Sequence, residues 1–130
     1  MIEINQKIKD LLEKKVVAFS TVGSDFGPNV IAVSFPKVVD RNKILITDNL
    51  MNKTRENILK NKKVSIAVWN EDPEIGYQLK GEAEYITDGD WKNLVDNMDN
   101  NKDFVHKAAI VITVYEIWDL VTTGLICKEN

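Results

Sequence analysis

The chain has 130 residues, of which 44% are hydrophobic and 28% charged, with a formal net charge of −3. This length predicts one globular domain spanning residues 1–130. The acidic balance argues against a nucleic-acid-binding protein, because basic side chains supply most of the affinity for phosphate backbones. No run approaches the roughly 20 apolar residues that span a bilayer, and no signal peptide is evident. With one cysteine and therefore no internal disulfide, we expect a cytoplasmic protein without a membrane partner.

The first part of the chain has the pattern of one helix followed by short strands. Apolar residues recur at helical spacing at positions 4, 8, 11 and 12, which predicts an amphipathic helix. A turn is expected in GSDFGPN, residues 23–29, because it carries two glycines and a proline. The strands predicted here cover residues 16–21, 30–35 and 37–47, the last interrupted by a turn at 40–43.

The second part predicts longer strands and two short helices. A helix is expected over about residues 53–61, and Trp91, Leu94, Val95 and Met98 form a second helical stripe. The strands predicted here cover residues 64–69, 77–86 and 108–118. Six strands with short turns and about three short helices indicate a mainly β protein with an antiparallel barrel.

The last predicted strand is apolar on both of its faces. Its two faces consist of Ile110, Ile112 and Val114 on one side and Ala109, Val111 and Tyr115 on the other. The outer face of a small barrel is normally wet, so a second surface must cover this strand. Either a helix of the same chain or a partner subunit would do so, and we predict a homodimer.

A lysine and a threonine stand at the start of the predicted helix in LMNKTRENILK, residues 50–60. The first turn of a helix exposes backbone N–H groups without internal partners, and the helix dipole places partial positive charge there. Such an end binds phosphate, to which Lys53 would add a full charge and Thr54 a hydroxyl donor. The alternative is purely structural, with Asn52 or Thr54 capping the helix.

The order of these elements, rather than any one of them, resembles a known family. The segments that carry the resemblance are VVAFSTVGSDFGPNVIAV, KVVDRNKILITDNLMNKTRENI, YQLKGEAEYITDG and AAIVITVYEIW. Together they resemble the FMN-binding split-barrel family, whose best-known members are the pyridoxamine 5′-phosphate oxidases, and most of all its small FMN-binding proteins from anaerobic bacteria. The resemblance covers residues 16–118 and implies a six-stranded antiparallel split β-barrel that binds FMN.

The resemblance also implies which residues contact the cofactor. The strand after the Gly-Pro turn would lie along the flavin, the next strand end would border its ring, and the Lys-Thr pair would clamp its phosphate. A polar residue on a later strand and an aromatic residue of the partner subunit would complete a site at the dimer interface. The residues at these positions are Val30, Ile31, Ala32, Val33, Ser34, Thr47, Asp48, Asn49, Lys53, Thr54, Gln78 and Trp118.

The function implied is transfer of electrons or a hydride through FMN, as an oxidoreductase or an electron carrier with an unidentified redox partner or small-molecule substrate. Pyridoxamine 5′-phosphate oxidation is not expected, because the true oxidases use extra arginines to hold the substrate phosphate and this chain has only Arg41 and Arg55. A lone histidine, His106, cannot assemble a metal site or a catalytic triad. The alternatives are a barrel that binds a deazaflavin or haem, and a cofactor-free binding module.

Overall fold

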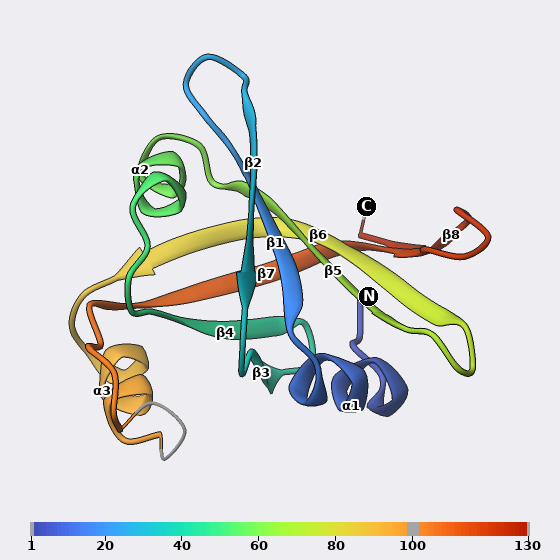
Figure 1. The fold of residues 1–130 in the computed structure, drawn as a ribbon, viewed down its shortest axis with the longest axis horizontal. Coiled ribbons are helices and arrows are strands. Elements are labelled where there is room, and N and C mark those ends of the chain that lie inside the picture. The colour runs from blue at the N-terminus through green and yellow to red at the C-terminus, as the bar shows by residue number, and fades with distance from the viewer. Residues whose placement is uncertain (1, 99–101, 130) are drawn as a thin grey trace.

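The computed structural model describes residues 2–98 and 102–129, which form three helices and eight strands (Figure 1). The elements in chain order are α1 (Gln6–Lys14), β1 (Val17–Val22), β2 (Pro28–Val33), β3 (Lys37–Asp40), β4 (Lys43–Asp48), α2 (Lys53–Lys60), β5 (Lys63–Asn70), β6 (Ile75–Ile86), α3 (Asp90–Asp96), β7 (Ala108–Asp119) and β8 (Leu125–Lys128).

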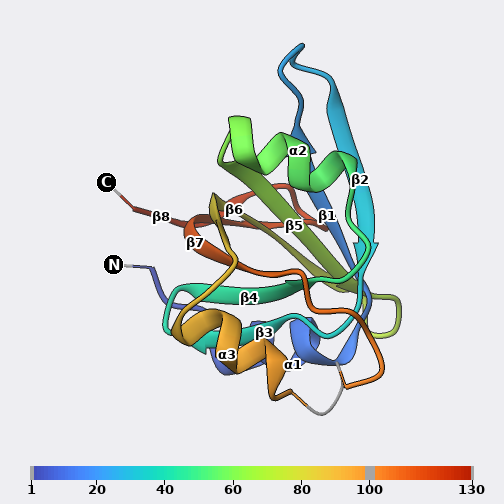
Figure 2. The same cartoon turned by 90° about the vertical axis from the view of Figure 1, so that its left-hand side faces the viewer.

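The strands form one curved antiparallel sheet in the order β2-β1-β5-β6-β7-β4-β3, and β8 pairs with β7 beyond this path. β2 and β3 follow each other in the sequence but stand at opposite ends of the sheet, which leaves the barrel split between them. Figure 2 shows α2 beside β2 at one end of the barrel and α1 and α3 at the other. The mainly β, antiparallel split barrel predicted from the sequence is confirmed.

The predicted number of six strands is wrong, because the structure has eight in the residues it describes. The stretch 37–47 forms a true hairpin of two paired strands, β3 and β4, in which the carboxylate of Asp40 accepts a hydrogen bond from the backbone of Arg41 at the turn. β8 has only four residues and three of them are exposed, so it lacks the alternating burial by which a strand is recognised in a sequence.

The barrel interior is apolar and is closed at one end by α1. Helix α1 begins after Asn5, whose side chain accepts a hydrogen bond from the backbone N–H of Ile8. Ile8, Leu11 and Leu12 are buried and join the inward residues of the strands in one core, as their helical spacing predicts. No helix in the described ranges is long and apolar enough to cross a membrane.

A second, smaller core lies outside the barrel, between α3 and the outer face of β7. Leu45, Val95, Ala109 and Val111 are buried there. Helix α3 therefore covers this part of the strand that is apolar on both faces. A helix of the same chain was one of the two alternatives that the sequence left open. Ala109 and Val111 therefore do not need a partner subunit to cover them. Tyr115 on the same face remains exposed, and the homodimer stays a prediction.

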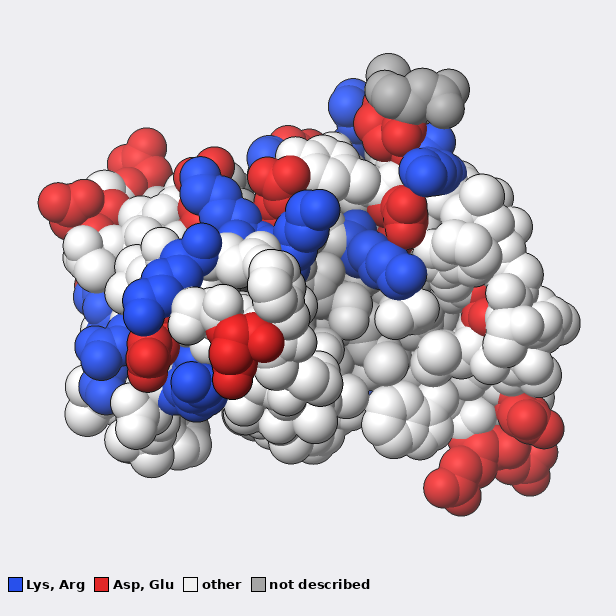
Figure 3. Space-filling view, turned by 90° about the horizontal axis from the view of Figure 1, so that it is seen from above, with Lys and Arg blue, Asp and Glu red and all other residues white. Residues whose placement is uncertain are grey.

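Charges of both signs share the surface. Figure 3, a view from above, shows basic and acidic side chains interspersed and no continuous basic area on that face.

Candidate functional site

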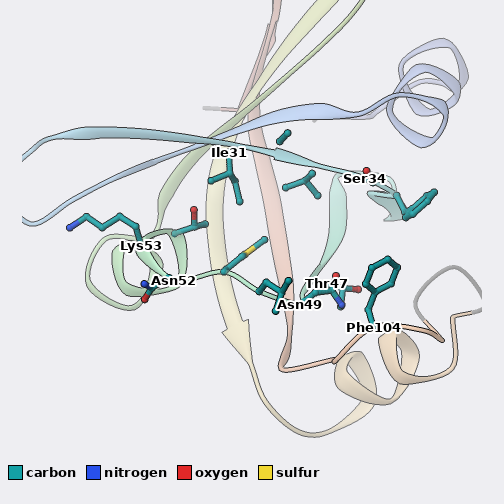
Figure 4. A pocket seen from close by; sticks show the side chains of 13 residues that line it. Ile31, Ser34, Thr47, Asn49, Asn52, Lys53 and Phe104 are labelled. Atoms are coloured by element: carbon teal, nitrogen blue, oxygen red, sulfur yellow. The ribbon is translucent and has the colours of Figure 1, made fainter.

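A cavity of about 540 Å³ opens between β2, the end of β4 and the start of α2 (Figure 4). This volume lies within the range of about 300–1,000 Å³ that is usual for small-molecule and cofactor sites. Its lining residues are Ile31, Ala32, Val33, Ser34, Phe35, Thr47, Asn49, Leu50, Met51, Asn52, Lys53, Thr54 and Phe104. In Figure 4, Lys53 and Phe104 lie at opposite ends of the cavity, with β2 along its length.

The cavity runs along the free edge of β2. Ile31, Ala32 and Val33 of β2 all line this cavity, as do Ser34 and Phe35 just beyond the strand. Because successive side chains of a strand point to opposite faces of the sheet, three consecutive strand residues indicate a cavity that follows the strand edge. Among the described strands β2 pairs with β1 alone, so its other edge presents unpaired backbone N–H and C=O groups to a ligand.

The first turn of α2 closes one end of the cavity. Asn52 occupies the position before the helix but makes no capping hydrogen bond among the described residues, so the alternative that it caps the helix is wrong. Asn52, Lys53 and Thr54 all line the cavity. The partial positive charge of a helix N-terminus therefore lies at this end. The Lys53 side chain extends outward from the same turn (Figure 4). The hydrogen bond from the backbone of Gly27 lowers the pKa of the Asp25 carboxyl, and the charge of Lys53 helps to lower it.

A largely buried network of polar side chains holds α2 against β1 and β2. The Asn29 amide donates to the Thr54 hydroxyl over 3.1 Å, and the Asn57 amide donates to the Thr21 hydroxyl over 2.9 Å. Asn29 also reaches Thr21, at 3.4 Å. Because buried polar groups are costly unless they are hydrogen-bonded, this network favours one position of the helix over any other.

Asp48 supports the cavity from behind rather than lining it. It is fully buried, and its carboxylate accepts hydrogen bonds from the backbone N–H of Met51, at 2.9 Å, and from the Tyr85 hydroxyl. Burial raises the pKa of Tyr85 to about 12, with further contributions from the hydrogen bond to Asp48 and the charge of Asp48. The carboxylate thus fixes the turn that leads from β4 into α2.

The far end of the cavity is an aromatic wall supplied by the segment before β7. The Asn49 amide donates to the backbone carbonyl of Val105 over 2.7 Å, and the backbone N–H of Lys107 donates to the carbonyl of Asp48 over 2.8 Å. These two bonds hold Phe104 against the cavity. No periodicity or motif in the sequence marks this segment, because its position depends on which loops meet in the fold.

Most of the residues predicted for the site line the cavity, but some do not. Those that line it are Ile31, Ala32, Val33, Ser34, Thr47, Asn49, Lys53 and Thr54. Those that lie elsewhere are Val30, Asp48, Gln78 and Trp118. The lining residues that sequence reasoning missed are Phe35, Leu50, Met51, Asn52 and Phe104.

Gln78 and Trp118 lie side by side but away from this cavity. They are cross-strand neighbours on β6 and β7 and alternate with buried residues, so they point to the outer face of the sheet. The Trp118 ring lies under the ammonium group of Lys80, 5.4 Å from the ring centroid, and its indole N–H donates to Glu116 over 3.1 Å. Neither residue reaches the cavity of its own chain.

Comparisons with known proteins bear on the family and the fold of the chain. The family profile described as pyridoxamine 5′-phosphate oxidase matches residues 4–120. An uncharacterized protein of Methanocaldococcus jannaschii is 36% identical over 124 residues, which cover 92% of this chain and 83% of that protein. A protein of Nitratidesulfovibrio vulgaris named FMN-binding protein is 31% identical over 87 residues, covering 61% of this chain and 70% of that protein. The solved structure of HupZ from group A Streptococcus is 27% identical with a TM-score of 0.87, covering 94% of this chain and 98% of that one.

The contact between Tyr85 and Asp48 gives a test of how the turn before α2 is held. Tyr85→Phe removes a donor from a buried carboxylate, so it should lower the free energy of unfolding by about 1–3 kcal/mol at neutral pH. The folded protein keeps the tyrosine proton up to a pKa of about 12 against a reference of 10.0. As the pH rises, the unfolded chain therefore loses this proton before the folded protein does. Between pH 10 and about pH 12, the free energy of unfolding of the wild type should fall more steeply than that of the variant.

Urea denaturation at pH 7 and at pH 11 measures both effects. Tyr115→Phe, on the exposed outer face of β7, is the matched control and should change stability by less than about 0.5 kcal/mol. Equal stabilities of Tyr85→Phe and the wild type at pH 7 would show that Asp48 does not depend on this bond.

Proposed function

Because the chain belongs to the pyridoxamine 5′-phosphate oxidase family, we propose that it is an FMN-binding protein that transfers electrons or a hydride through the bound flavin. The observation that carries the proposal is the cavity itself, in which an unpaired strand edge leads to an uncapped helix N-terminus beside a lysine. The name of the Nitratidesulfovibrio vulgaris relative supports the choice of FMN.

The α2 end of the cavity fits a phosphate group. A phosphate monoester carries a charge of roughly −1.5 to −2 at neutral pH and three strong acceptor oxygens. Helix N–H groups and the Lys53 ammonium are donors of the kind such oxygens prefer. Thr54 accepts a hydrogen bond from Asn29, so its own hydroxyl proton serves as a donor to the phosphate.

The rest of the cavity fits a flat heterocycle with one polar edge. The free backbone edge of β2 offers hydrogen-bonding groups along residues 31–33, and Thr47 and Asn49 add polar side chains opposite. Met51 and Phe104 provide apolar surface for the faces of the ring. The lining thus divides into a cationic end for the phosphate and a mixed end for the isoalloxazine.

FMN, when bound, supplies the electron- and hydride-transfer chemistry, and the protein binds it, orients it and controls access to it. On this proposal β2 orients the ring, α2 anchors the phosphate, and Phe104 limits the access of water to one end. Oxidation of pyridoxamine 5′-phosphate itself is not part of the proposal. Arg41 and Arg55 are the only arginines of the chain, and they do not make a second phosphate-binding cluster.

The proposal includes a cytoplasmic homodimer with FMN at the subunit interface. Gln78 and Trp118 point outward from the sheet and away from their own cavity, so their proposed contacts are with the cofactor of the second subunit. Sedimentation of the purified protein should then give twice the mass of one chain. A single-chain mass at micromolar concentration would contradict the interface and the roles of these two residues.

Lys53→Ala tests the phosphate end. Loss of a charge-assisted hydrogen bond costs about 1.5–3 kcal/mol, so the variant should bind FMN roughly ten- to a hundredfold more weakly. Riboflavin has the same ring without the phosphate, so its affinity should be the same for the variant and the wild type. Titration of the apoprotein, followed by the quenching of flavin fluorescence, measures both dissociation constants.

Lys62→Ala is the matched control, since Lys62 is also exposed and lies outside the cavity. An FMN affinity of Lys53→Ala equal to that of the wild type would remove Lys53 from the site. The same titration with a deazaflavin and with haem covers the other cofactors that this fold suggests. Tighter binding of either one than of FMN would contradict the proposed cofactor.

A further inference from the structure

A second cavity, also of about 540 Å³, adjoins the first and shares Phe35 with it. It lies around the segment that leads into β3, which Figure 1 shows between α1 and α3. Its lining residues are Glu13, Phe35, Pro36, Lys37, Leu94, Asn97 and Met98. Phe35 is the residue common to both linings, so its side chain forms part of the wall between the two cavities.

The backbone of Phe35 adopts a conformation that bulky residues avoid. Its φ angle is 61°, in the left-handed region that favours glycine. The following residue, Pro36, disfavours the right-handed helical region at this position but leaves the extended region open. The strain therefore comes from the path of the chain, and replacing Phe35 by glycine would relieve it.

Burial in the core does not explain why a phenylalanine stands there. Its side chain is 48% exposed, and it does not belong to either hydrophobic core. Backbone strain of this kind is often found at ligand-binding sites. Phe35 lines both cavities, so its side chain is held at the boundary between them.

The second cavity has the chemistry of a site for a small aromatic anion. Phe35, Pro36, Leu94 and Met98 give it an apolar wall, and Lys37 adds a cation. Glu13 also lines it, and its carboxylate accepts a hydrogen bond from the backbone N–H of Val38 over 2.8 Å. Among the described residues Glu13 forms no ion pair with Lys37, so the ammonium group remains available to a ligand. A ligand with a flat apolar body and one anionic group matches this combination.

We propose that the second cavity binds a small aromatic carboxylate or a similar anion, and that Phe35 is the wall that separates this ligand from the cofactor cavity. The proposal rests on the proposed function, because it takes FMN as the ligand of the first cavity. It adds the class of molecule that binds in the neighbouring cavity. Phe35 is thereby a positioning residue for both ligands.

Calorimetric titration of the full chain with 2-naphthoate tests the second cavity, in the absence and presence of FMN. The wild type should bind one equivalent. Leu94→Glu places a carboxylate in the cavity and should weaken 2-naphthoate at least tenfold while leaving FMN affinity within twofold. Leu94 is 37% exposed, so the variant should fold.

Leu59→Glu is the matched control, because Leu59 is also on a helix, is 65% exposed and lies outside both cavities. It should bind 2-naphthoate as the wild type does. No binding of 2-naphthoate to the wild type up to millimolar concentration would overturn the proposal. An effect of Leu94→Glu no larger than that of Leu59→Glu would also overturn it.

Phe35→Gly tests the shared wall. The variant should keep or raise the melting temperature, because strain is relieved, yet bind both FMN and 2-naphthoate at least threefold more weakly. Phe26→Gly is the matched control: Phe26 has a φ angle of 63° and is 84% exposed, but it lies at the β1–β2 turn outside both cavities. Affinities of Phe35→Gly within twofold of the wild type for both ligands would overturn the role of Phe35.

These measurements separate the two proposals. A wild-type protein that binds 2-naphthoate in a Leu94-dependent way but does not bind FMN would contradict the proposed function and leave the second site standing. A protein that binds FMN in a Lys53-dependent way but not 2-naphthoate would contradict only the second site.

Discussion

The hydrogen bond from the Asn29 amide to the Thr54 hydroxyl joins the edge strand β2 to the first turn of α2, and the candidate site depends on it. Without this contact the positive end of the helix and the unpaired edge of the strand would be separate features. Thr21 and Asn57 continue the bond into a buried network, so the helix cannot shift without leaving polar groups unsatisfied. The corner between β2 and α2 is therefore set by the fold before any ligand arrives.

The elements follow from the sequence because periodicity reports which residues share a face. The strands predicted at 16–21 and 30–35 overlap β1 (Val17–Val22) and β2 (Pro28–Val33) with offsets of one and two residues, and the apolar stripe of α1 is buried as its spacing requires. The Lys-Thr pair was found because a helix start is a local feature. Periodicity reports nothing about which elements meet, so β8 and the Phe104 wall were missed. Asp48 was expected to border the flavin ring, but it points into the protein, where it fixes the adjoining turn.

The split in the barrel explains why two cavities adjoin each other. β2 and β3 are consecutive in the chain but belong to opposite ends of the sheet, so the segment between them must cross the opening. Phe35 lies on this crossing, with a positive φ angle and with a cavity on each side. A fully closed barrel would pair β2 with another strand, and neither the free backbone edge nor the crossing would exist. The same irregularity thus provides the proposed cofactor site and the proposed second site.

The central claim is that a phosphate lies at the first turn of α2 while a ring lies along the edge of β2. Amide chemical shifts test it most directly, in a ¹⁵N-labelled protein titrated with FMN and, separately, with riboflavin. The account predicts that the amides of Lys53, Thr54 and Arg55 shift with FMN and not with riboflavin, whereas those of residues 31–33 shift with both. First-turn amides of α2 that do not respond to saturating FMN would contradict the account.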